Sequence, residues 1–154
     1  MRIYSLVKDF FAFLERTTLR GPKWPNYYST YYKAHQDFFE AYFSIFSLLD
    51  KESLRGRVES IKKGDYSALR NLAAFSPPEA IVQRAYERCR QVTAGDEEPD
   101  VYLFVGFFSP AAFLMTLTDK PVMCFGLERF KDFRLMGILF AHEYAHFLMS
   151  RSHG

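Results

Sequence analysis

The sequence predicts an α+β protein with a helical N-terminal half, a small β-sheet and a C-terminal helix. In residues 1–95, apolar side chains recur at helical spacing. After a polar loop, short apolar runs rich in β-branched and aromatic residues predict strands. From Asp132 to about Met149 the chain is again apolar and is predicted to form one helix. Helices followed by a separate sheet are typical of the α+β class, and 154 residues suit a single domain, 1–154, made of a helical part (1–95) and a sheet-plus-helix part (100–150).

The helical half is predicted to contain five segments separated by helix breakers. The first segment, 2–16, ends before Gly21-Pro22 and Trp24-Pro25, which favour a loop over residues 17–26. Asp65 is a predicted N-cap, and Ser76-Pro77-Pro78 is typical of a helix start. The remaining segments are 27–49, 51–63, 66–75 and, from Ser76 or Pro77, to about residue 92.

The segment 27–49 carries an aromatic line at helical spacing. This line could form a stacking surface for nucleic acid or a groove for a peptide, but it lacks the interleaved basic residues that nucleic-acid binding requires. We therefore interpret it as core packing, with tyrosine hydroxyls at the edge of the core. His35 falls on the same line and is interpreted as a core or interface histidine, with a ligand role kept open. The line consists of Tyr28, Tyr31, Tyr32, His35, Phe38, Phe39, Tyr42, Phe43, Phe46 and Leu49.

The second half begins after the polar loop 95–100, whose acidic residues lack the ligand spacing of an EF-hand. Strands are predicted at 101–105, 112–117 and 122–125, with a turn at 118–121. Residues 126–130 link the last strand to the C-terminal helix, for which Asp132 is a predicted N-cap. The sheet therefore lies immediately before that helix in the chain.

The charge, the cysteines and the apolar runs of the sequence indicate the cellular compartment and exclude some classes of partner. The net charge is +2 with both signs interspersed, so neither nucleic acid nor a membrane surface is predicted as a partner. Cys89 and Cys124 have no spacing that predicts a disulfide scaffold or a zinc–thiolate site, which favours a reducing compartment. Charged residues interrupt the N-terminus before any signal peptide could form, and no apolar run approaches a membrane span. We expect a cytoplasmic protein.

The C-terminal helix contains a motif with chemical meaning, His142-Glu143-Tyr144-Ala145-His146, an HExxH sequence. Residues four apart on a helix lie about 40° apart around the axis and about 6 Å apart along it, so both imidazoles can bind one metal ion. Glu143 is rotated about 100° from His142 and is placed to accept a proton from a zinc-activated water rather than to bind the metal. The motif predicts Zn²⁺ as cofactor, with His142 and His146 as metal ligands and Glu143 as the catalytic base.

This arrangement resembles the upper half of a zincin metallopeptidase. More closely, VYLFVGFF, PVMCFGLERFKDF and LFAHEYAHFL are similar to a family of bacterial predicted zinc-dependent proteases, in which a strand ending in Gly-Leu-Glu (126–128 here) precedes the HExxH helix. The resemblance covers about residues 100–148. It implies a peptide or protein substrate bound by β-addition to an edge strand beside the helix, and 101–105 and 112–125 are the candidate edges.

The resemblance also implies a third protein ligand that the motif does not supply. In a gluzincin it is a Glu on a later helix, and this sequence ends eight residues after His146; in a metzincin it is a His at the position of Ser152 here. The candidates are His153, Glu128, His35 and a residue from a second subunit of a homo-oligomer. His153 would lie about 16 Å beyond His142 along a straight helix, so the tail would have to fold back.

Two functions therefore stay open on the sequence. The first is a zinc-dependent metallohydrolase, a peptidase in which Glu143 acts as general base. The alternative is a degenerate or truncated zincin that serves as a non-catalytic binding module, which the missing third ligand favours. A helical interaction protein that uses the aromatic segment 27–49 as its partner surface is a further rival.

Overall fold

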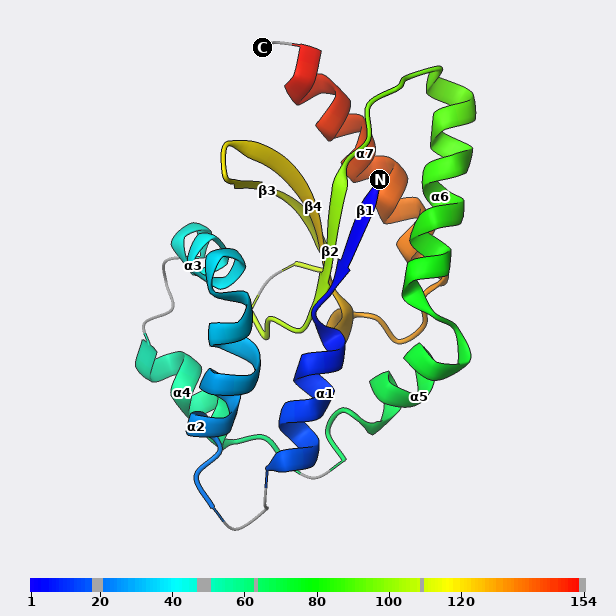
Figure 1. Ribbon diagram of the computed structural model, residues 1–154. Coiled ribbons are helices and arrows are strands. Elements are labelled where there is room, and N and C mark those ends of the chain that lie inside the picture. The colour runs from blue at the N-terminus through cyan, green and yellow to red at the C-terminus, as the bar shows by residue number, and fades with distance from the viewer. Residues whose placement is uncertain (18–20, 47–50, 63, 109, 153–154) are drawn as a thin grey trace.

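The computed structural model has an α+β architecture built around one mixed sheet (Figure 1). It describes residues 1–154 apart from 18–20, 47–50, 63, 109 and 153–154. The strands are β1 (Arg2–Ser5), β2 (Asp100–Phe104), β3 (Ala112–Leu117) and β4 (Lys120–Gly126). The helices are α1 (Val7–Arg16), α2 (Trp24–Tyr27), α3 (Gln36–Ile45), α4 (Lys51–Glu59), α5 (Ser67–Phe75), α6 (Pro78–Thr93) and α7 (Arg134–Ser152), with short turns η1 (Tyr28–Tyr32), η2 (Lys33–His35) and η3 (Leu127–Arg129).

The strand order in the sheet is β1-β2-β4-β3. The first three of these strands are parallel to one another, and β3 pairs antiparallel with β4 through a tight turn. In that turn Thr118 and Asp119 both have positive φ, as a two-residue type I′ hairpin turn requires. The order places β3 at one edge of the sheet and β1 at the other.

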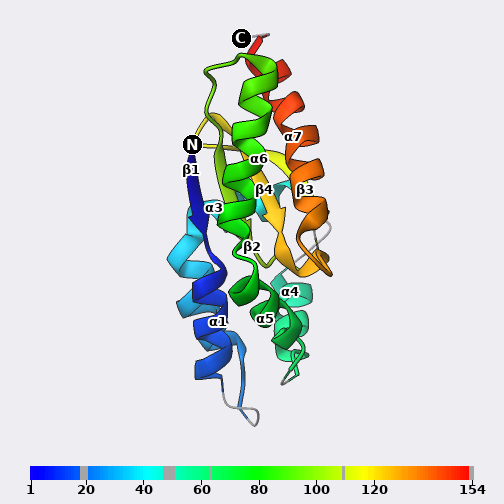
Figure 2. The same cartoon turned by 90° about the vertical axis from the view of Figure 1, so that its right-hand side faces the viewer.

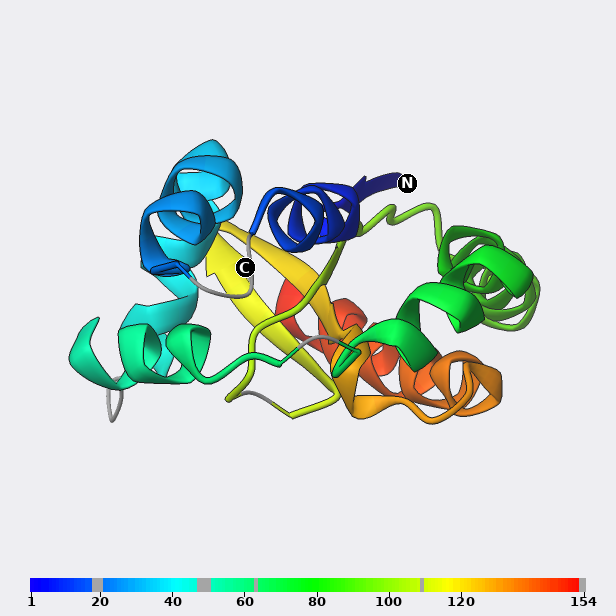
Figure 3. The same ribbon diagram turned by 90° about the horizontal axis from the view of Figure 1, so that it is seen from below.

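Helices cover both faces of the sheet (Figure 3). On one face, Phe38 of α3 stacks on Tyr102 and packs edge-on against Phe104. On the other face, Phe140 of α7 stacks on Phe125. Figure 2 shows α6 beside α7 on this second face, and the Tyr86 and Tyr144 rings meet edge-to-face between them. The HExxH helix is therefore held by β4 and β3 beneath it and by α6 along one side.

The N-terminal segment corrects the predicted helix over 2–16. Residues Arg2–Ser5 form β1, parallel to β2, and the helix begins only at Val7. The Leu6 N–H donates to the Leu103 carbonyl at 2.8 Å, and the N-terminal ammonium pairs with Glu98 at 2.8 Å. Because the apolar spacing of so short a segment fits either structure, the pairing with a strand about a hundred residues later decides it.

The predicted continuous helix over 27–49 is also corrected. The helical path begins earlier, at Trp24, with Pro25 in the first turn, where a missing N–H is tolerated. A π-helical turn and a 3₁₀ turn, η1 and η2, then separate α2 from α3. Leu49 lies outside the described residues. These turns have a different number of residues per turn from an α-helix, so they change which side chains of the segment point toward the sheet.

Core packing of this aromatic segment is confirmed. Tyr27, Tyr31, Phe38, Phe39 and Tyr42 are buried, although Tyr28 remains 40% exposed. Two of the hydroxyls find partners just after β2: Tyr31 donates to the Val105 carbonyl at 3.0 Å, and Tyr42 donates to the Gly106 carbonyl at 3.1 Å. The buried Tyr27 hydroxyl has no hydrogen-bond partner among the described residues.

The predictions for the other elements are confirmed apart from one cap and the length of the segment 51–63, in which α4 ends at Glu59. Strands β2, β3 and β4 and helices α5 and α6 lie where the sequence predicts them, to within about two residues. Asp132 accepts the Arg134 N–H at 2.9 Å at the start of α7, as a capping residue does. Asp65 does not cap α5, because its carboxylate accepts the Lys62 N–H at 2.8 Å within the preceding turn. No helix among the described residues combines the length and apolarity needed to cross a membrane.

Candidate metal centre

The core side of α7 determines where the motif residues lie. Met136, Phe140, Tyr144 and Phe147 are buried. Tyr144 is turned toward α6, packs against Tyr86 and donates its hydroxyl to the Glu97 carbonyl at 3.1 Å. With about 100° between successive residues, Glu143 emerges on the opposite side of Phe140 from Tyr144. That side of the helix faces away from α6 and toward β3, on which α7 also packs.

The two motif histidines converge on the exposed side of α7. Their Nε2 atoms are 3.1 Å apart, and the ring planes are inclined at 79°. Two imidazoles bound to one tetrahedral zinc ion at 2.0–2.1 Å would hold their nitrogens about 3.3 Å apart. The pair is thus already close to the geometry of two zinc ligands, and both rings are accessible from solvent.

Glu143 lies beside this pair and is half-buried. No described residue forms a hydrogen bond or an ion pair with its carboxylate. Burial raises the pKa of the Cys124 thiol on β4, and the charge of Glu143 raises it further. The carboxylate is therefore near the sheet and makes no hydrogen bond or ion pair with the described part of the chain.

His35 does not join the histidine pair, which corrects its candidacy as third ligand. It lies in η2 on the α3 side of the sheet, whereas α7 covers the other side (Figure 3). Its Nε2 is 2.6 Å from the Asp9 carboxylate of α1. This pair ties η2 to α1, a structural contact.

Glu128 precedes α7 in the chain, but its carboxylate is likewise held by hydrogen bonds away from the histidine pair. Its Oε1 accepts the N–H groups of Gly106 at 3.1 Å and Phe107 at 2.9 Å. Phe107 has φ of +72°, unusual for a bulky residue, so the carboxylate holds a strained turn after β2. The other oxygen, Oε2, is buried with no described hydrogen-bond partner. Glu128 thus stabilises a loop rather than binding a metal with His142 and His146.

Burial raises the pKa of the Glu128 carboxyl above its ordinary value of 4.5, which gives a testable pH dependence. A pKa that is higher in the folded than in the unfolded chain gives stability that is complete below pH 4.5 and is lost as the pH rises through the folded-state pKa. Glu128→Gln keeps an acceptor oxygen and has no proton to lose. We expect the free energy of unfolding of the variant, relative to the parent, to increase from about pH 4.5 upward. Urea denaturation of both proteins across this range checks it, and a difference independent of pH contradicts it.

His153, the remaining candidate in the chain, lies outside the described residues. Within the described ranges, no group of three or more His, Cys, Asp or Glu side chains could hold a metal ion. The residues present therefore fit two positions of a tetrahedral zinc site, and the described structure supplies no third protein donor.

The structure also decides between the two candidate edge strands. Residues 101–105 do not form an edge, because β2 pairs with β1 on one side and β4 on the other. Within 112–125, β4 is internal and only β3 lies at the edge. An edge strand beside the HExxH helix is thus present, and it is β3.

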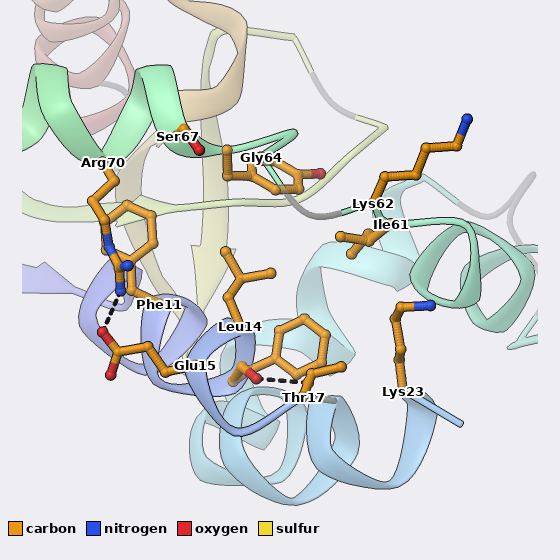
Figure 4. Close-up of a pocket in the computed structure, with 12 residues that line it drawn as sticks. Phe11, Leu14, Glu15, Thr17, Lys23, Ile61, Lys62, Gly64, Ser67 and Arg70 are labelled. Atoms are coloured by element: carbon orange, nitrogen blue, oxygen red, sulfur yellow. Dashed lines mark hydrogen bonds and ion pairs between the residues drawn. The ribbon is translucent and has the colours of Figure 1, made fainter. Parts of the chain in front are cut away.

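Two cavities lie away from the histidine pair. One of about 490 Å³ is bounded by α1, α5 and the turn before α5, with the Arg70–Glu15 ion pair on its rim (Figure 4). Its floor is apolar and includes Phe11, Phe13 and Leu14. The other, of about 650 Å³, includes His35. Neither is lined by α7, and both motif histidines are exposed.

The sequence reasoning missed one feature of α7, its exposed apolar side. Leu135, Ile138 and Met149 are 61%, 68% and 53% exposed on the same side of the helix as the histidines. The signal was in the sequence, because a helix that is apolar all round is expected to be covered all round.

The sequence matches no protein-family model, and no curated protein or solved structure shows significant similarity to it. The fold and the site thus define an α+β protein with a convergent histidine pair on its last helix.

Proposed function

We propose that this protein is a zinc-dependent hydrolase that acts on peptides. His142 and His146 would hold the metal and Glu143 would act as the general base. The observation that carries the proposal is the 3.1 Å separation of the two Nε2 atoms on an exposed helix face. Residues four apart on a helix bring their side chains together, and the HExxH spacing uses this to direct two imidazoles toward one zinc ion.

The residues of this chain would have separate roles in the hydrolysis. Zinc, when bound, lowers the pKa of water and polarises a carbonyl group. Glu143 would accept the proton of the attacking water and pass it to the leaving amine. Its carboxylate is free of structural partners among the described residues, as a base must be. Its side chain is half-buried and emerges on the side of α7 that packs on β3 and β4.

Strand β3 supports the choice of a peptide as substrate. It is an edge strand, and its neighbour α7 carries the motif. An extended peptide can add to such an edge through main-chain hydrogen bonds, which bind any sequence in the same conformation. A scissile bond bound there would lie on the side of α7 from which Glu143 emerges. The two free cysteines favour a reducing compartment, and we place the protein in the cytoplasm.

A non-catalytic binding module is the second candidate. It is favoured by the lack of a third donor among the described residues, since a catalytic zinc site uses three protein ligands and one open position. In this form the same histidine pair would bind metal weakly, and the edge strand would bind a peptide without cleaving it.

Elemental analysis of the untagged protein tests the proposal, together with a peptide-hydrolysis assay on the same sample. We expect zinc to bind at a fixed ratio to the chain, and chelation to remove both the metal and the hydrolysis. Zinc without hydrolysis would select the binding module. If the protein bound no zinc after incubation with micromolar metal, both proposed metal-dependent functions, the hydrolase and the binding module, would be refuted.

A further inference from the structure

The exposed side of α7 forms an apolar surface around the histidine pair, here called the α7 face. It consists of Leu135, Ile138, Ala141, His142, Ala145, His146 and Met149. Around the helix axis, the large apolar residues lie about 140–180° from Phe140, opposite the core side. His142 lies within this sector and His146 at its border with Glu143. Soluble proteins rarely leave such a surface bare, so it indicates a partner.

We propose that the partner is a second copy of this chain and that the two copies share one zinc ion. His142 and His146 of one copy, with the partner's His142 and the partner's His146, would supply four nitrogens. The inference rests on the proposed zinc site and adds its partner and its regulation. A two-fold axis through the metal would make the two α7 faces pack on each other, as an isologous interface requires.

Ligand count favours a second copy over an unrelated partner. Structural zinc is almost always bound by four protein ligands, and one chain presents two convergent donors in its described part. A two-fold operation doubles two donors to four without requiring any new residue. A partner of different sequence would have to bring its own pair of donors at the same spacing.

The composition of the α7 face also suits self-association. None of its seven members is a permanently charged residue, and Arg134, which lies on the same side at the N-terminal end of α7, has its charge offset by an ion pair with Asp132. The flanking Leu135, Ile138 and Met149 would bury apolar area on both sides of the metal.

The shared site would regulate the proposed hydrolysis. Four protein ligands leave no position for water, whereas a single chain leaves positions open. The dimer is therefore the closed, inactive form and the zinc-loaded monomer the active one. Excess protein over metal favours the dimer, because one ion then serves two chains.

Zinc chloride titrated into the full chain tests this, with molar mass followed by light scattering and zinc by elemental analysis. We expect a dimer with one zinc per two chains, reversed by chelator. Ile138→Arg introduces a charge into the α7 face, brings no metal-binding atom and leaves the histidines intact. We expect it to stay monomeric and to bind zinc at least tenfold more weakly. Phe75→Arg is the matched control, because Phe75 is 91% exposed at the end of α5, and this variant should dimerise like the parent.

Three results would overturn the inference. A parent that binds zinc one to one and stays monomeric would refute the shared site and leave the proposed zinc site standing. Dimerisation that is unchanged by chelator or by His146→Ala would show that the metal does not join the copies. Failure to bind zinc in either form would refute the inference together with the proposed function.

Discussion

Glu143→Gln is expected to lower kcat for peptide hydrolysis by about 10²–10⁴-fold, the usual contribution of a general base. The amide has nearly the shape of the carboxylate but cannot accept a proton from water. Glu143 forms no hydrogen bond or ion pair with a described residue, so the substitution should leave folding and zinc content unchanged. Steady-state kinetics on the zinc-loaded variant, with its zinc measured in parallel, check both halves of this expectation.

Glu128→Gln is the matched control for this variant, since it makes the same chemical change at a carboxylate that holds a loop. It should keep kcat within a few-fold of the parent value. A Glu143→Gln variant that retains zinc and full activity would eliminate Glu143 as the base. Equal loss in both variants would point to a fold-wide effect of removing a carboxylate.

His146→Ala is expected to weaken zinc binding by more than about 100-fold, because even outer-shell partners of a metal site are worth 10–100-fold. The variant removes one of two convergent donors and leaves His142 alone on the surface. Isothermal titration with zinc measures the loss. The side chain is exposed, so the free energy of unfolding without metal should change by less than about 0.5 kcal/mol.

His35→Ala provides the comparison for this loss. It removes a histidine from the opposite side of the sheet, where the ring pairs with Asp9. Zinc affinity should be unchanged, while stability should fall modestly through the lost contact. If His35→Ala weakened zinc binding as much as His146→Ala, the metal would not be at the α7 pair.

The local features of this protein followed from the sequence because they depend on neighbours along the chain. Helical periodicity alone brings His142 and His146 to one side of α7, and their Nε2 atoms meet as the spacing predicts. The strands β2, β3 and β4 were predicted by their composition and their turn, which are also local. The α+β class followed from the order of these elements.

Tertiary structure decided what depends on partners far along the chain. Residues 2–5 became a strand because β2 offered an open edge, which their own spacing could not reveal. Glu128 and His35 are chemically suited to bind a metal, but main-chain amides of the loop after β2 and Asp9 engage them first. Which strand forms the sheet edge, and that one side of α7 is left uncovered, are likewise consequences of packing. Spacing along the chain therefore determined the histidine pair, and long-range pairing and burial determined what surrounds it.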